Sequence, residues 1–300
     1  MLSNMHTTVL LKESVDGLNL HSGATVVDGT LGAGGHTELM CENLGRNIRV
    51  IALDLDTDAI ERAKARLSRL DCDVEYVESN FRDIDKVLEN LKVTGVDGIL
   101  LDLGFSNDQL ESSGRGISFK KDEPLKMTLR KSIGDNEFDA SDIVNTWQEE
   151  DIANVIYGYG EERFARRIAR EIIESREKSP IKTTHELVEI IERAVPTFYK
   201  RGRIHPATKT FQALRIAVNS ELENLRIVLE KGFALLRPGG RLAVISFHSL
   251  EDRIVKNFMR DRDKDDTGKL LNKKPITPSD EEAKRNPKSR SAKLRIIEKI

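Results

Sequence analysis

Four glycines fall in a short loop near the start of the chain, in "VVDGTLGAGGHTELM" (residues 26–40), where an apolar run gives way to a helical pattern. Glycine permits positive φ and lets a ligand approach the backbone without meeting a Cβ atom. N–H groups at the start of a helix add hydrogen-bond donors and partial positive charge. The loop therefore either binds a nucleotide-like cofactor or only turns the chain. The glycines are Gly29, Gly32, Gly34 and Gly35.

An acidic residue closes the next apolar run. In "IALDLD", Asp54 follows Gly32 by 22 residues, and an acid at about this distance can accept both ribose hydroxyls in a doubly wound sheet. A helix N-cap is the other interpretation, but Asp56 fits that role better. A calcium-binding loop is excluded, because alanine stands where the loop requires its glycine and its final glutamate. The glycine loop and Asp54 fit an NAD site and an S-adenosylmethionine site equally well.

Downstream residues favour S-adenosylmethionine. "ESNFRDI" places polar Asn80 and apolar Phe81 after the third apolar run, where they could flank an adenine, although Phe81 could equally be plain core. "LRPGGRLAVISF" indicates a helix, a turn and a strand, a sequence of elements that closes many class I methyltransferase domains. A catalytic His or Lys arrangement of the dehydrogenase kind is not evident. These features favour a methyltransferase over a nicotinamide dehydrogenase.

The elements that would position these residues alternate between strands and helices. This alternation predicts an α/β fold of class I (Rossmann-like) type, with a doubly wound, mainly parallel sheet covered on both faces. Helices are expected between the first four strands, over "TELMCENL", "DAIERAKARLSRL" and "IDKVLENLK". The expected strands cover residues 24–28, 49–54, 74–78, 96–103 and 241–247, with a last strand in "AKLRIIEKI".

Helical patterns dominate from about residue 139 to 195, so an all-helical inserted domain should interrupt the sheet domain. In "EERFARRIAREIIESREK", Phe164, Ile168 and Ile172 recur at four-residue steps. "THELVEIIERAV" is expected to be capped by Thr184 and to bury Leu187, Ile190 and Ile191. "TFQALRIAVNSELENLRIVLEKGFALL" is expected to be one long helix. The predicted division is 1–107 for the first part of the methyltransferase domain, 108–205 for the helical, substrate-recognising insertion and 206–300 for the second part with a basic tail.

Composition limits the other properties. The chain has 300 residues with 48 basic and 50 acidic side chains, so its net charge of −2 gives no indication of a nucleic-acid partner. Cys41 and Cys72 have no metal-type spacing and are expected to be reduced, partly buried thiols; the sequence predicts no metal site. The N-terminus does not resemble a signal peptide, and apolar runs fall short of the ~20 residues that span a bilayer. We expect a soluble, cytoplasmic protein that does not bind a membrane.

Eight segments, in order from His6 to Arg295, resemble the bacterial 16S ribosomal RNA cytosine-N4 methyltransferase family. They are "HTTVLLKE", "DGTLGAGGH", "DGILLDLGFSNDQL", "RGISF", "YGEERFARRIAR", "HPATKTFQALRIAVNSEL", "LRPGGRLAVISFHSLEDRIVK" and "NPKSRSAKLR". The resemblance implies an S-adenosylmethionine-dependent enzyme whose partner is 16S rRNA in the small ribosomal subunit and whose target is a cytosine of the decoding region. It also implies cofactor contacts at residues identical to those of the family, namely Gly34, Gly35, His36, Asp54, Phe81, Asp102 and Gln109.

The chain departs from the family pattern in two places. The family's "DLGVSSPQL" is "DLGFSNDQL" here, and its "GPLDMRMD" is "EPLKMTLRK". Asp102 and Gln109 are identical to the family residues, whereas the substitutions near them could alter the shape of the cytosine pocket. The differing positions are Phe105, Asn107, Asp108, Lys126 and Thr128.

The expected chemistry is methyl transfer to an exocyclic amine. Because the lone pair of cytosine N4 is delocalised into the ring, acceptors for the amino hydrogens should assist the attack. Asp102, at the end of the fourth strand, is the expected catalytic acceptor, and it could instead bind the methionine end of the cofactor. The target base must lie in a loop or be flipped out. His248 is a second catalytic candidate and Ser249 a further substrate contact; the alternative is that Ser249 caps a helix and His248 faces solvent.

Local basic clusters are the expected contacts to RNA phosphates. One is "KRGRIHPATK" (200–209) and the other is the tail from 284 onward. The arginines of "EERFARRIAR" are interleaved with glutamates, which favours a solvated helix face with i,i+4 pairs. The tail residues are Lys284, Arg285, Lys288, Arg290, Lys293, Arg295 and Lys299.

Other classes of function stay open at this point. They are a methyltransferase for DNA or a small molecule, a nicotinamide dehydrogenase, and a ribosome-assembly factor that keeps the fold without the activity. Binding of S-adenosylhomocysteine rather than NAD would separate the second from the leading hypothesis. The sequence does not fix the oligomeric state, and a homodimer is one state we consider.

Overall fold

The computed structural model describes residues 8–104, 114–129 and 138–300. The chain divides into a sheet unit, residues 1–106 and 222–300, and a helical unit, residues 107–221. The second boundary therefore lies after Glu221, whereas the sequence analysis placed it after His205. The cause is helix α11 (Ala207–Asn219), whose Phe211 and Leu214 are part of the apolar core of the helical unit.

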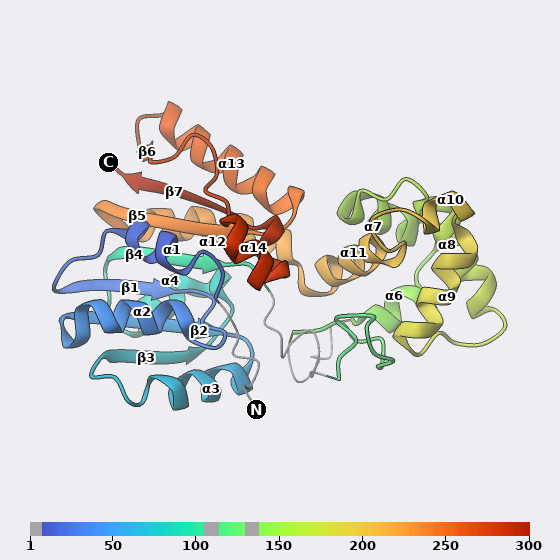
Figure 1. Cartoon of the computed structure of the whole chain (residues 1–300), viewed down its shortest axis with the longest axis horizontal. Helices are drawn as coiled ribbons and strands as arrows, with labels where there is room; N and C mark the ends of the chain where they lie inside the picture. The colour runs from blue at the N-terminus through green and yellow to red at the C-terminus, as the bar shows by residue number, and fades with distance from the viewer. Residues whose placement is uncertain (1–7, 105–113, 130–137) are drawn as a thin grey trace. The chain divides into compact units, whose positions relative to one another are not determined.

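The sheet unit is built on seven strands in the order β3-β2-β1-β4-β5-β7-β6 (Figure 1). The first five strands in this order are parallel, while β7 is antiparallel to both β5 and β6. The six strands expected from the sequence are all present, and β6 is additional. Their bounds are β1 Ala24–Asp28, β2 Ile48–Asp54, β3 Asp73–Glu78, β4 Val96–Asp102, β5 Leu236–Ser246, β6 Gly268–Leu270 and β7 Lys293–Lys299.

Helices cover both faces of this sheet. Side chains alternate between the faces along each strand, so Val26 belongs to one apolar cluster and Val27 to the other. The first cluster lies under α1 (Leu11–Leu18), α2 (Gly35–Leu44) and α3 (Thr57–Leu67), and the second under α4 (Ile84–Asn90), α12 (Glu221–Leu235) and α13 (Ser249–Lys264). A short helix, α14 (Asp280–Arg285), precedes β7. The predicted doubly wound class I fold is confirmed.

The helical unit packs around Ile168 and Ile172, which are both fully buried. Its helix α9 is capped by Thr183 and not by Thr184, because the Thr183 hydroxyl accepts from the Glu186 N–H in a capping box. Leu187, Ile190 and Ile191 are buried as expected. The described helices are α6 (Ala140–Thr146), α7 (Glu149–Gly160), α8 (Ala165–Arg176), α9 (Thr184–Ala194), α10 (Thr197–Lys200) and α11.

Two local predictions were wrong. The expected single long helix is two helices, α11 and α12, because Ser220 between them takes a left-handed φ of 49°. The expected turn "RPGG" lies inside β5: Val96 pairs with Leu236 and Gly98 with Arg241, so β5 carries the extra residues as an irregularity beside β4. The local sequence thus indicated a continuous helix where the chain breaks at Ser220, and a turn where β5 continues.

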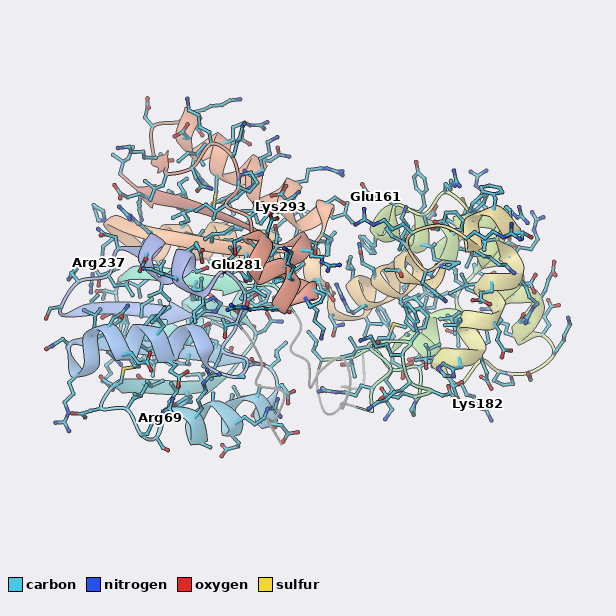
Figure 2. The ribbon with its side chains drawn as sticks, viewed as in Figure 1. Arg69, Glu161, Lys182, Arg237, Glu281 and Lys293 are labelled. Atoms are coloured by element: carbon cyan, nitrogen blue, oxygen red, sulfur yellow. A yellow bond between two sulfur atoms is a disulfide. The ribbon has the colours of Figure 1, made fainter. Side chains whose placement is uncertain are left out.

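A disulfide joins Cys41 on α2 to Cys72, just before β3 (Figure 2). This corrects the expectation of two free thiols. The residues are 31 positions apart in sequence, but the packing of α2 beside β2 and α3 brings their Cα atoms to 5.5 Å, within the range of a disulfide. The pairing depends on the tertiary fold and has no local sequence signal. A membrane-spanning helix does not occur in the described ranges, whose helices are too short or too polar for that role.

Candidate active site

Three carboxyl groups meet where neighbouring parallel strands end. Asp28 ends β1, Asp54 ends β2 and Asp102 ends β4. In the sheet register Asp28 pairs with Ala52 and with Leu100, so Asp54 and Asp102 extend two residues beyond it on either side. The strand order reverses between β1 and β4, which is where open α/β sheets bind their ligands.

The glycine loop fills the gap left by the shorter β1. Its Gly32 N–H donates to Asp54 Oδ2 at 2.8 Å, and its Thr30 hydroxyl accepts from the Asp102 N–H at 2.7 Å. The Leu31 N–H donates to the Leu53 carbonyl at 2.9 Å. Gly32 has a φ of 52°, a left-handed conformation that favours glycine. The loop is therefore fixed between β2 and β4 by the protein itself.

Gly34 and Gly35 begin α2 where space is short. Gly34, the N-cap, has a φ of 77°, and a Cβ atom there would lie 3.1 Å from the Ala63 Cβ. A Cβ atom on Gly35 would overlap the Thr8 side chain. The structure thus gives a packing reason for both glycines, and their contact with a cofactor stays a prediction.

The pKa values of the three carboxyl groups are raised above that of an ordinary aspartate. Burial raises the pKa of Asp102 to about 7, and the charges of Asp28 and Glu251 add to the rise. Burial also raises the pKa of Asp28 to about 6 and shifts the pKa of Asp54 upward. Removal from water disfavours each negative charge. This edge of the sheet would consequently be stabilised by a positively charged ligand.

His36 lies beside Asp102. Its side chain is buried, with Nε2 3.2 Å from the Val9 carbonyl oxygen and Nδ1 4.0 Å from Asp102 Oδ2. Because the Val9 carbonyl oxygen can only accept, we assign a proton to Nε2. Nδ1 faces the Asp102 carboxyl group. His36 thus lies next to the cluster of carboxyl groups, and the cofactor contact that the resemblance implied for it stays a prediction.

The residues after β3 have the expected placement at the same edge. Asn80 is buried and accepts from the Arg82 N–H, which caps the short 3-10 helix Phe81–Asp83. Phe81 is half-buried against the apolar cluster under α4. Asp54 accepts backbone N–H groups from Gly32 at Oδ2 and from Asp56 at Oδ1, and the Leu55 N–H also interacts with its carboxyl group.

The structure describes Asp56, near Asp54, but does not describe Gln109. Asp56 is the N-cap of α3 and accepts from the Asp58 N–H, which confirms the capping role that the sequence gave it. Gln109, with the family departures at Phe105, Asn107 and Asp108, lies outside the described residues.

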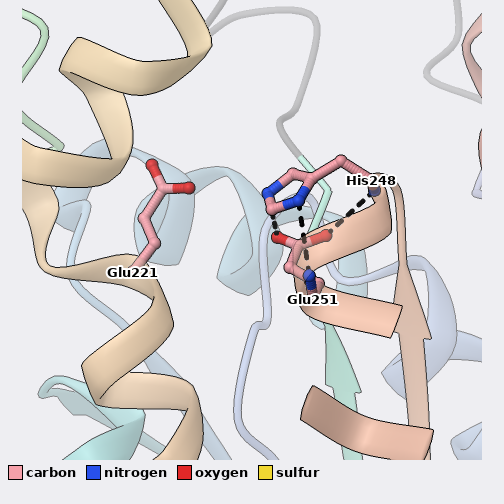
Figure 3. A group of neighbouring side chains, drawn as sticks. All are labelled: Glu221, His248 and Glu251. Atoms are coloured by element: carbon pink, nitrogen blue, oxygen red, sulfur yellow. Dashed lines mark hydrogen bonds and ion pairs between the residues drawn. The ribbon is translucent and has the colours of Figure 1, made fainter. Parts of the chain in front are cut away.

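His248 is held by its own helix (Figure 3). It is the N-cap of α13: Nδ1 accepts from the Glu251 N–H, and Nε2 lies 3.2 Å from Glu251 Oε1. The side chain is 11% exposed. The capping alternative was therefore wrong in detail, because His248 and not Ser249 caps the helix and its ring is largely buried. Figure 3 also draws Glu221, whose carboxylate is bound by Arg215 at 2.9 Å within the helical unit.

Sequence reasoning missed two acidic residues of this site. Asp28 is 1% exposed and accepts from the Thr37 hydroxyl at 2.7 Å and from the Thr30 N–H at 3.2 Å. Glu251, 3% exposed, accepts from the Phe247 N–H at 2.8 Å. A signal for Asp28 was available, since an acid that ends an apolar strand directly before a glycine loop must lie at the sheet edge.

The basic tail is largely part of the fold. Lys293 and Arg295 lie in β7 and bind Asp252 at 3.1 and 2.7 Å, and Lys299 donates to the Ala234 carbonyl (Lys293 is labelled in Figure 2). These three residues were expected to bind RNA phosphates; they have partners within the sheet unit, and their contact with RNA stays a prediction. Lys284, Arg285 and Arg290 of the same cluster are exposed.

Comparison with known proteins adds the family. A sequence profile of the MraW methylase family matches residues 3–300.

The chain belongs to the MraW methylase family.

Three relatives that align over nearly their whole length carry the same name. "Ribosomal RNA small subunit methyltransferase H" of Brevibacillus brevis is 44% identical, with 100% of this chain and 99% of the relative aligned. The protein of that name from Deinococcus deserti is 50% identical over 99% of this chain and 94% of the relative. The one from Clostridium botulinum strain Loch Maree is 44% identical over 98% and 99%. This chain is thus similar to these MraW methylases along its whole length.

Proposed function

We propose that this protein transfers a methyl group from S-adenosylmethionine to the N4 amine of a cytosine in 16S rRNA of the small ribosomal subunit. The observation that carries the proposal is the cluster of three desolvated carboxyl groups around a preformed glycine loop, in a chain of the MraW methylase family. S-adenosylmethionine carries positive charge on its sulfonium and its amino group. A buried acidic cluster suits such a ligand better than it suits a pyrophosphate, which favours this cofactor over NAD.

The residues that would hold the cofactor follow from their positions. Asp54 ends β2 at this edge and would accept the ribose hydroxyls, and Phe81 offers an apolar surface for the adenine. Gly34 and Gly35 allow close backbone approach beside His36. Gln109 is a further contact that rests on the family resemblance.

When bound, S-adenosylmethionine supplies an activated methyl group. The chain's own task is to orient the amine and to receive the proton that N4 loses as its new N–C bond forms. We assign this task to Asp102, because a carboxylate with a pKa of about 7 accepts a proton readily at neutral pH. The carbonyl groups of Leu103 and Gly104 are additional acceptors for the amino hydrogens. His248, oriented by Glu251, is proposed to contact the base.

The deciding experiment is methyl transfer from labelled S-adenosylmethionine to small ribosomal subunits that lack the modification, followed by nucleoside analysis. N4-methylcytidine is expected, and its absence would refute the proposal. Asp102→Asn should lose most of the activity. Asp73→Asn, which changes an exposed carboxylate at the start of β3, is the matched control and should keep it. Calorimetry with S-adenosylhomocysteine and with NAD separates the methyltransferase from a dehydrogenase.

The RNA contacts belong to the same proposal. Lys200, Arg201 and Arg203 are exposed on the helical unit, and they suit the phosphates of the substrate. The homodimer considered from the sequence is a separate question, which light scattering of the purified protein answers.

A further inference from the structure

A group of aromatic rings and arginines lies on the surface of the helical unit. Phe198 on α10 is 64% exposed, although exposed phenylalanines of this degree are uncommon on soluble proteins. The guanidinium carbon of Arg163 lies 5.6 Å from the centre of its ring, 4.8 Å from that of Phe164 and 5.1 Å from that of Tyr199. We refer to Arg163, Phe164, Phe198 and Tyr199 as the aromatic–arginine cluster.

The inner members of the cluster are held firmly. Glu162 is fully buried and accepts hydrogen bonds from the Tyr199 hydroxyl and from the Phe164 N–H. The rings of Phe164 and Tyr199 meet edge to face, with centroids 5.0 Å apart. Phe198 contacts Phe164 at 6.4 Å between centroids and is the outermost ring. The cluster therefore has a fixed base and one ring that faces solvent.

The charge around the cluster is positive. Arg166 and Arg167 are exposed on α8, and the Arg167 guanidinium lies 5.8 Å from the Phe164 ring centre. Residues 200–209, directly after Phe198 and Tyr199, contain Lys200, Arg201, Arg203 and Lys209 and no acidic residue. Of the two glutamates that precede Arg163, Glu162 is buried and hydrogen-bonded to Tyr199, whereas Glu161 is exposed, so cations outnumber acids around the cluster.

This arrangement corrects one expectation from the sequence. The arginines of "EERFARRIAR" were expected to form i,i+4 pairs along one helix face. In the described part of the chain, the ion pairs of α8 connect different helices, Arg170 with Glu149 on α7 and Glu171 with Arg193 on α9. Arg163 instead stacks on aromatic rings.

We propose that the aromatic–arginine cluster is a stacking site for a base of single-stranded RNA, with residues 200–203 binding the adjoining phosphates. An exposed aromatic ring beside a planar guanidinium offers two π faces to a base, and each base has a π face whatever its identity. A flanking run of cations without acids matches the phosphates that every nucleotide carries. The inference rests on the proposed function, since it names a part of the helical unit that binds the RNA substrate.

The charge pattern argues against a second copy of the chain as the occupant. A two-fold contact places the same patch opposite itself, so the arginines and lysines around Phe198 would face one another. An apolar protein partner would gain from the Phe198 ring but would leave these cations without compensation.

The test measures binding of a short single-stranded RNA that contains 2-aminopurine, whose fluorescence is quenched when the base stacks on an aromatic ring. Phe198→Ala should weaken binding about 5- to 150-fold, the range that loss of one base–aromatic contact produces, and should abolish the quenching. Phe198→Trp should keep both. Phe198→Leu keeps an apolar side chain but no ring, so it should behave as the alanine variant. Tyr157→Ala removes another exposed ring, 68% exposed on α7, and is the matched control.

Specific outcomes overturn the inference. Wild-type affinity in Phe198→Ala would exclude the stacking site. Full RNA affinity in Phe198→Leu would show that an apolar side chain is sufficient and would exclude stacking on the ring. A further readout separates stacking from charge: Phe198→Ala should leave the salt dependence of binding unchanged, whereas Arg201→Gln should reduce its logarithmic slope by about 1.

The same variants show whether this inference and the proposed function stand or fall separately. On small ribosomal subunits, Phe198→Ala should raise KM with little change in kcat, because the cluster is proposed to bind substrate and takes no part in the transfer of the methyl group. If the wild type forms no N4-methylcytidine but its RNA binding depends on Phe198, the proposed function fails and the stacking site stands. If methylation occurs and Phe198→Ala binds as the wild type does, the stacking site alone fails.

Discussion

Replacing Asp102 by asparagine should stabilise the protein at pH 8 while weakening its binding of S-adenosylmethionine. Burial raises the pKa of Asp102 to about 7, from 3.8 for an unperturbed aspartate. The folded state therefore keeps a proton that the unfolded state has already released. The resulting contribution to stability is fully present below about pH 4 and is lost as the pH rises to 7.

The size of the effect follows from this shift. Moving a pKa from 3.8 to about 7 corresponds to about 4 kcal/mol. Because the side chain is 18% exposed, water relieves part of the strain, and we expect ~2–4 kcal/mol for the gain in Asp102→Asn at pH 8. Asparagine has nearly the same shape and no charge to desolvate, so the gain should vanish near pH 4.

Urea unfolding of the wild type and of Asp102→Asn between pH 4 and pH 8.5 tests this reasoning. The two stability curves should converge at the acidic end and diverge between pH 4 and 7. The affinity for S-adenosylmethionine, measured by calorimetry at pH 8, should fall about 10- to 100-fold, as for loss of one interaction with a charged group. A wild type that is the more stable protein at pH 8, or a difference that does not vary with pH, would refute the reasoning. Asp73→Asn should stay within ~0.5 kcal/mol of the wild type throughout.

Three further predictions follow from the same geometry. Binding of S-adenosylmethionine at pH 6.5 should release protons from Asp28 and Asp102, because a bound cation lowers both pKa values; calorimetry in two buffers of different ionisation enthalpy would detect this, and identical heats would contradict it. Gly35→Ala should destabilise the sheet unit by ~1–3 kcal/mol through overpacking and should reduce cofactor affinity, as melting and calorimetry would show; unchanged values of both would contradict the packing argument. Thiol titration of the unfolded, unreduced protein should find Cys41 and Cys72 unreactive, and reduction should lower stability by about 4 kcal/mol, the value for a loop of this length; two reactive thiols before reduction would exclude the bond.

The sheet and the cofactor edge could be predicted from sequence because their signals are local. The inner parallel strands β1, β2 and β4 are buried on both faces and so appear as nearly continuous apolar runs, as in 96–103. Glycine at positions of positive φ marks the loop, and Asp54 follows at the interval that one βαβ unit sets. These features depend on neighbours in sequence or on a single crossover.

Features that depend on register and packing could not be predicted in this way. The raised pKa of Asp102 arises from burial and from the charges of Asp28 and Glu251, which lie on two other elements. The disulfide needs α2 and the start of β3 to be adjacent, and the cap of α13 uses a histidine, which is not among the usual capping residues. The second boundary of the helical unit was misplaced because the amphipathic pattern of α11 does not show whether the helix packs on the sheet or on the other helices of the helical unit.

The place of β7 in the sheet has a consequence for synthesis. Residues 293–299 pair with β5 on one side and β6 on the other, so β5 is an edge strand until they leave the ribosome. The helical unit, complete at residue 221, is made well before that moment and can fold first. During this interval the N–H and C=O groups along β5 are open to pairing with another chain. The nascent protein is therefore most vulnerable to aggregation at the β5 edge, between the synthesis of residue 246 and that of residue 299.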